Sequence, residues 1–122
     1  MVTPPPILHA DLPIEELTLP PLASGWSQPQ NEAPLRIFRQ GKRVFFAGAL
    51  VCGANAGNKP FVSPLPEGWR PAGREWFPCS TPKGVCGFLV KPSGEVEWGT
   101  GAWELGRGSW FTLNTISYLA EN

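Results

Sequence analysis

From about residue 33 onward, the chain alternates short apolar runs with turn-forming residues. Aliphatic and aromatic residues recur in the segments 35–39, 43–51, 74–79, 85–90, 95–98 and 110–119. Apolar runs of this length are typical of strands, and the Gly and Pro residues between them exclude long helices. Roughly seven short strands at this spacing predict an all-β fold, a small antiparallel β-sandwich or jelly-roll-like knob.

Local turn signals define two hairpins and one edge strand. Residues 40–42, Gln-Gly-Lys, separate two apolar runs and predict a hairpin turn. Residues 91–94, Lys-Pro-Ser-Gly, predict a second one, because the Ser-Gly pair supplies the positive φ that such a turn needs. In residues 95–98 polar and apolar side chains alternate, which predicts a strand with one solvent-exposed face and one face packed against the core. Pro78 places its strand, residues 74–79, near a sheet edge or the end of the strand.

Residues 1–23 differ from the rest and predict an extended Pro-rich docking arm, followed by a head domain over residues 24–122. Repeated Pro favours an extended course and denies this segment a regular hydrogen-bonded ladder. Residues 11–17 are compatible with a single helical turn capped by Asp11. A purely solvating linker would not carry many large aliphatic residues, so those of the arm are expected to bind a partner. They are Ile7, Leu8, Leu12, Ile14, Leu17, Leu19 and Leu22.

Composition restricts the classes of partner. A chain of 122 residues and 13.3 kDa fits one compact domain with a short appendage. Ten basic residues balance ten acidic ones, which argues against nucleic-acid binding. Charged residues make up only 16% of the chain, so weak self-repulsion favours association with other proteins. We expect no membrane insertion and no secretion signal, because no apolar stretch reaches about 18 residues and the first residues lack a basic start.

Few residues are suited to catalysis. The single histidine, His9, lies in the arm, so any nucleophile has one candidate base, in the segment expected to be least rigid. Glu95 and Glu97 share one strand face, where paired carboxylates are usually just solvated rather than set across a cleft. We therefore expect no catalytic residue, and a hydrolase is the least favoured class.

The three cysteines do not suggest a metal site. Cys52, Cys79 and Cys86 lack the close pairs that zinc ligands usually form. A disulfide between Cys79 and Cys86 across a hairpin is geometrically conceivable, but free buried thiols are favoured. No metal and no cofactor are expected.

Tryptophan residues are the main candidates for ligand binding. Trp69 lies in a Pro-rich turn and Trp103 lies in the Gly-rich segment 99–108. An exposed Trp can stack on a sugar ring, and neighbouring polar loop residues can complete such a pocket. The candidate ligand-binding residues are Trp69, Trp103, Arg107, Asn55 and Asn58. The alternative, which we favour, is that each Trp plugs an end of the sandwich or packs at a subunit contact.

A family resemblance is carried by residues 65–71, Leu-Pro-Glu-Gly-Trp-Arg-Pro. An apolar strand precedes this turn, the Gly-centred hairpin of residues 91–96 follows it, and an aromatic strand over residues 110–118 closes the chain. Over about residues 24 to 120, this frame resembles the β-sandwich heads of bacteriophage tail fibres, baseplate receptor-binding proteins and other virion appendages. The resemblance implies a homotrimeric knob without enzymatic activity, carried on the virion after assembly in the host cytoplasm.

Two functions are compatible with this resemblance. The first is a non-enzymatic phage virion structural protein, such as a decoration protein, head–tail protein or tail-tip knob. It would dock through its N-terminal arm on neighbouring capsid, tail or baseplate subunits. The alternative is the host-receptor-binding head of a tail fibre or baseplate, which would bind cell-surface glycan through its loops.

Overall fold

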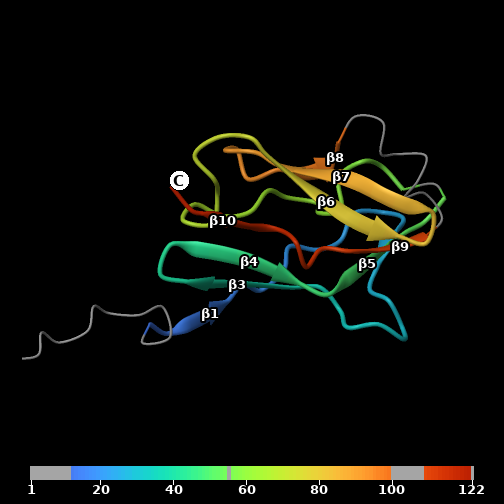
Figure 1. Ribbon diagram of the computed structural model, residues 1–122, viewed down its shortest axis with the longest axis horizontal. Coiled ribbons are helices and arrows are strands. Elements are labelled where there is room, and N and C mark those ends of the chain that lie inside the picture. Colours follow the sequence, from blue (N-terminus) through green and yellow to red (C-terminus); the bar gives the residue numbers. More distant parts are fainter. Residues whose placement is uncertain (1–11, 55, 100–108, 122) are drawn as a thin grey trace, which may run out of the picture.

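The computed structural model describes residues 12–54, 56–99 and 109–121, which form an all-β fold (Figure 1). Its strands are β1 (Ile14–Glu16), β2 (Trp26–Ser27), β3 (Arg36–Gln40), β4 (Arg43–Ala47), β5 (Ala49–Cys52), β6 (Glu75–Thr81), β7 (Gly84–Val90), β8 (Val96–Trp98), β9 (Ser109–Thr112) and β10 (Ser117–Leu119). They form three antiparallel sheets with the orders β1-β3-β4-β10, β2-β5-β9 and β6-β7-β8. The predicted antiparallel β-sandwich is confirmed.

The first two sheets are joined where the chain passes from β4 to β5 through Gly48 (Figure 1). Gly48 has a φ of 94°, and a Cβ there would lie under 3.0 Å from the carbonyl oxygens of Ala33 and Pro34. Only glycine meets both demands. The single strand predicted over residues 43–51 is therefore divided between two sheets. The strand predicted over residues 110–119 is likewise divided, into β9 and β10.

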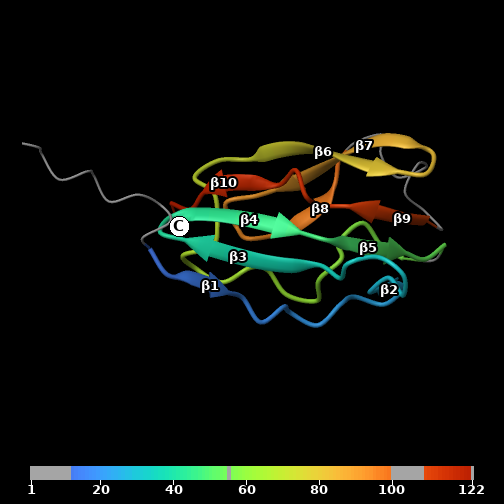
Figure 2. The same cartoon turned by 60° about the horizontal axis from the view of Figure 1, so that its bottom comes forward.

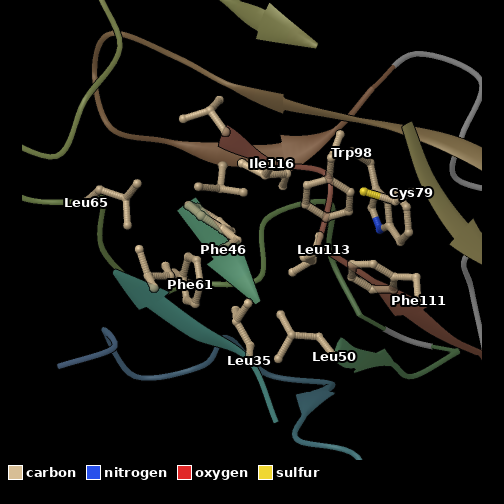
Figure 3. Packing of buried hydrophobic residues seen from close by; sticks show 14 of the residues in the cluster. Leu35, Phe46, Leu50, Phe61, Leu65, Cys79, Trp98, Phe111, Leu113 and Ile116 are labelled. Atoms are coloured by element: carbon tan, nitrogen blue, oxygen red, sulfur yellow. The ribbon is translucent and has the colours of Figure 1, made fainter. Parts of the chain in front are cut away.

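The β6-β7-β8 sheet lies on the other side of the molecule from β1 and β3, and the hydrophobic core lies between the layers (Figures 2 and 3). The centre of this core is aromatic. The rings of Trp26, Phe88, Trp98 and Phe111 come from four strands, and every pair among them has a centroid distance between 4.5 and 6.4 Å. Aromatic pairs at such distances each add about 0.5–1.5 kcal/mol beyond the area they bury. This cluster therefore joins the β6-β7-β8 sheet to the β2-β5-β9 sheet.

The Pro-rich turn at residues 65–71 is present, and its tryptophan is packed against the domain. The backbone N–H of Trp69 donates to the carbonyl oxygen of Pro66 at 3.1 Å. Its side chain is only 7% exposed, and the guanidinium of Arg39 lies 4.5 Å from its ring centroid. The hydroxyl of Tyr118 donates to the Trp69 carbonyl oxygen at 2.6 Å. Trp69 is thus packed against its own domain.

The described part of the predicted arm belongs to the domain's own sheet. β1 pairs antiparallel with β3. Ion pairs from Arg36 to Glu16 at 2.5 Å and from Arg39 to Glu15 at 2.7 Å connect the same two strands. The single helical turn expected over residues 11–17 is therefore wrong, because β1 is extended and paired through the sheet.

No structural break separates an arm from a head at residue 23. Leu17, Leu19 and Leu22 pack against the central core, and the backbone of Leu22 forms a bridge to Phe61. Leu12 lies beside Gly41, at the turn between β3 and β4. Among the described residues, the globular unit therefore starts at residue 12 instead of residue 24. Leu17, Leu19 and Leu22 contribute to the packing of the domain itself.

Candidate functional site

The residues expected to bind a ligand are not assembled into a pocket by the described part of the chain. Asn55, Trp103 and Arg107 lie outside the described residues. Trp69 is buried under Arg39, so its ring is not available as a stacking platform. Asn58 is exposed, and its carbonyl oxygen accepts a hydrogen bond from the backbone N–H of Trp98 at 2.9 Å.

The residues expected to bind a partner are also distributed differently from the prediction. Ile7 and Leu8, like His9, lie outside the described residues. Leu12, Leu17, Leu19 and Leu22 are all partly buried. Among the predicted partner-binding residues that the structure describes, Ile14 alone is mostly exposed, with an exposed fraction of 59%.

The β6–β7 hairpin presents large apolar side chains to solvent. Directly opposite residues in an antiparallel pair share a face, as do residues two apart along a strand. In this hairpin Pro78 lies opposite Gly87, and Val85 lies two residues before Gly87 on β7. Trp76 lies two residues before Pro78 on β6. Trp76, Pro78, Val85 and Gly87 therefore share the face that points away from the core, which we call the outer hairpin face. Trp76 is 53% exposed and Val85 is 64% exposed.

Part of the indole of Trp76 lies over two glycines, Gly87 and Gly99, which we call the glycine floor. The backbone N–H of Gly99 donates to the Gly87 carbonyl oxygen at 2.8 Å, so the two glycines are neighbours across strands. A Cβ at Gly87 would lie 3.9 Å from Trp76 Cε3, and one at Gly99 would lie under 3.0 Å from Trp76 Cζ3. Gly in a strand often marks a close approach of other groups. Here the close group is the indole, and a side chain at position 99 would displace it.

The surroundings of Trp76 are mostly apolar. The guanidinium of Arg74 lies 5.8 Å from its ring centroid. A shallow hollow of about 320 Å³ lies on the hairpin. It is lined by Trp76, Phe77, Pro78, Val85, Cys86 and Gly87. This hollow suits an apolar group that stacks on a ring better than a ligand that needs several hydrogen bonds.

A second hollow, of about 500 Å³, lies between β10 and the start of β6. It holds charges of both signs, from Arg43, Glu75 and Glu121. The guanidinium of Arg43 donates to the hydroxyl oxygen of Ser117 at 3.0 Å. Burial, and then the nearby charge of Glu75, raise the pKa of Tyr118 well above its usual value. A phenol held in its protonated form is not available as a base.

The expectation of free, buried cysteines is confirmed. Cys79 and Cys86 lie opposite each other in the β6–β7 pairing, and both are buried as free thiols. Cys52 is also buried. Burial raises the pKa of Cys79 to about 12 and that of Cys86 to about 11. Because the thiolate is the reactive form, these two thiols are inert near neutral pH.

Residues 12–54, 56–99 and 109–121 contain no group of three or more His, Cys, Asp or Glu side chains that could hold a metal ion. The same ranges contain no helix long and apolar enough to cross a membrane.

Trp76 and its glycine floor are the functional candidate that the sequence interpretation missed. The alternation in residues 74–79 places Trp76 on the face opposite Phe77, but does not say which face is exposed. The floor depends on Gly87 and Gly99 being neighbours, which follows only from the strand register. A conspicuous signal was nevertheless available, since Gly87 interrupts an otherwise apolar strand.

No protein-family model matches this chain, and no curated protein matches it.

Proposed function

We propose that this chain is a non-enzymatic structural protein of a bacteriophage virion, a β-sandwich knob that binds neighbouring protein subunits. The observation that carries the proposal of subunit binding is the outer hairpin face, where Trp76 and Val85 are exposed on a well-paired hairpin. Aromatic residues are enriched in protein interfaces and dominate their binding energy. The virion assignment is supported by the resemblance of residues 65–71 and the following hairpin to phage appendage heads.

The non-enzymatic part of the proposal is supported by the state of the paired carboxylates. A glycosidase acid needs a raised pKa. The side-chain hydrogen bond from Lys59, followed by that from Ser93, lowers the pKa of Glu95 instead. Glu97 forms an ion pair with Lys91 at 2.8 Å. Glu95 is thus paired with Lys59, and Glu97 is paired with Lys91.

The described structure changes how the knob would dock. Because Leu17, Leu19 and Leu22 pack against their own core, they cannot supply most of the contact with a partner. The attachment surface would instead combine the outer hairpin face with residues 1–11. The low charge of the chain favours such association.

The virion assignment is tested by immunogold labelling of purified particles with an antibody raised against this chain. We expect label at a fixed position on the particle, with the chain present in purified virions in a constant ratio to the capsid protein. A chain found in the infected-cell lysate and absent from purified particles would refute the assignment.

The alternative, a host-receptor head, is favoured by one observation. Trp76 is 53% exposed, its indole lies over Gly87 and Gly99, and Arg74 is nearby, as in a sugar-stacking platform. The apolar neighbours Pro78 and Val85 favour a protein partner, because a sugar also needs polar groups around it. Val62 is a second exposed apolar residue, outside the outer hairpin face, and serves as the control. Glycan-array binding that is lost on Trp76→Ala, and retained on Val62→Ala, would support the receptor function.

A further inference from the structure

The outer hairpin face is suited to a ligand that stacks on it rather than to one that adds a strand. β6 is at the edge of its sheet, a position that normally invites pairing with another chain. Pro78 in the middle of β6 has no N–H to donate, which disfavours strand addition there. The open surface is instead the ring of Trp76 with its apolar neighbours. A partner that brings flat apolar rings and needs few hydrogen bonds fits this surface.

A polyproline segment has these properties. It has no internal hydrogen bonds, its backbone stays solvated, and aromatic surfaces bind its rings. This chain carries such a segment at residues 4–8, Pro-Pro-Pro-Ile-Leu, ahead of the first described residue. Its prolines fix φ in the free chain, which lowers the entropy lost on binding.

We propose that the outer hairpin face binds residues 4–8 of a second copy of this chain. This inference rests on the proposed function and deepens it by naming the first subunit contact and the residues on both sides. The proline rings stack on the open face of Trp76. Ile7 and Leu8 then cover the hollow beside Pro78 and Val85.

A contact between two copies is favoured over one within a single chain because of where the segment joins the described part of the chain at Leu12. Leu12 is held beside Gly41, and β1 and the β6–β7 hairpin lie on opposite sides of the sandwich (Figure 2). The four residues from Leu8 to Leu12 reach at most about 14 Å. The two layers alone are about 10 Å apart, and the path must also pass around the sheet edge to the far face.

A contact of this kind is head-to-tail, since each copy gives its N-terminal segment and receives its neighbour's on a different surface. Such heterologous contacts close into a ring when the rotation between copies permits. The homotrimer implied by the family resemblance is one such ring.

The test measures self-association of the full-length chain by sedimentation velocity over a range of concentrations. Two variants each remove one side of the contact: Trp76→Ala, and a triple change of Pro4, Pro5 and Pro6 to Ser. We expect each to raise the dissociation constant at least tenfold. The combined variant should bind no more than about threefold weaker than either alone, because both changes remove one shared contact. Val62→Ala is the matched control, since Val62 is 68% exposed and lies outside the outer hairpin face.

A second measurement keeps the inference testable if Trp76→Ala fails to fold. A synthetic peptide of residues 1–10 is added to the full-length triple-Ser variant, and the indole N–H signals are followed by NMR. The Trp76 signal should shift, while those of the buried Trp26 and Trp98 stay fixed. An unchanged Trp76 signal, or a wild-type chain that is monomeric at every concentration, would overturn the inference. The inference would also be overturned if the two single variants each weaken self-association and their losses of binding free energy add in the combined variant. Glycan binding that depends on Trp76, in a chain that does not self-associate, would overturn it as well. Normal immunogold labelling of particles together with any of these results would refute this contact alone and leave the virion assignment standing.

Discussion

Replacing Gly48 with alanine tests the crossing between the first two sheets. Gly48 has a φ of 94°, and a Cβ would lie under 3.0 Å from the backbone of Pro34. Backbone strain of this kind costs about 1–3 kcal/mol, and forced displacement of packed neighbours costs a further 1–3 kcal/mol or so. The expected loss in unfolding free energy is therefore about 2–6 kcal/mol, a large share of the roughly 5–15 kcal/mol that a domain has.

Two other glycines separate the strain from the steric clash. Gly84 has a φ of 135°, but a Cβ there would meet nothing within 4 Å, so Gly84→Ala isolates the strain and should cost about 1–3 kcal/mol. Gly73 has neither a positive φ nor a neighbour within 4 Å of its Cβ position. Gly73→Ala should therefore leave stability unchanged within about 0.5 kcal/mol or raise it slightly.

Urea denaturation followed by tryptophan fluorescence measures all three variants. With a urea dependence of about 1–3 kcal/mol per molar, a loss of about 4 kcal/mol lowers the midpoint by about 2 M. Gly73→Ala should be the most stable of the three variants, Gly84→Ala should be less stable, and Gly48→Ala should be the least stable. Equal losses for Gly48→Ala and Gly84→Ala would mean that the backbone at Pro34 does not crowd position 48. The reasoning for a tight crossing between β4 and β5 would then be refuted.

Three further predictions concern the core, its thiols and the N-terminal segment. Tyr118→Phe should cost about 1–3 kcal/mol in urea denaturation, because it leaves the buried carbonyl oxygen of Trp69 without its 2.6 Å donor; no loss would contradict that bond. Stability should fall as pH rises from about 9 toward 11, because the folded pKa values of Cys79 and Cys86, about 12 and 11, exceed the ordinary value of 9.0 and unfolding lets the thiols ionise. The fall should be smaller in Cys79→Ala, and an equal fall would assign the effect to other groups. Deleting residues 2–20 should lower the melting temperature, since it removes β1 and the core contact of Leu17. At a concentration low enough to keep the chain monomeric, deleting residues 2–10 should leave the melting temperature nearly unchanged. Equal effects of the two deletions would contradict the packing of Leu17.

The sequence by itself determined the features that depend on near neighbours. Apolar runs bounded by Gly and Pro were sufficient to predict an all-β sandwich, and the Lys-Pro-Ser-Gly turn of residues 91–94 was found with the strands on both sides of it. The alternation in residues 95–98 also predicted correctly that Val96 and Trp98 face the core. Such features follow from backbone sterics and from the two-residue period of a strand, which act within a few residues.

Only the tertiary structure decided which surfaces are covered. Period-two alternation assigns two faces to a strand, but a second layer determines which of them is buried. Trp69 in its turn and Trp76 in its strand are both aromatic residues near Pro and Gly, yet the first is capped by Arg39 and the second lies open on a glycine floor. In the same way, the Pro-rich composition around β1 indicated an extended segment and could not show that β3 offers it a pairing edge. These outcomes depend on contacts between residues far apart in the chain, and no local pattern records them.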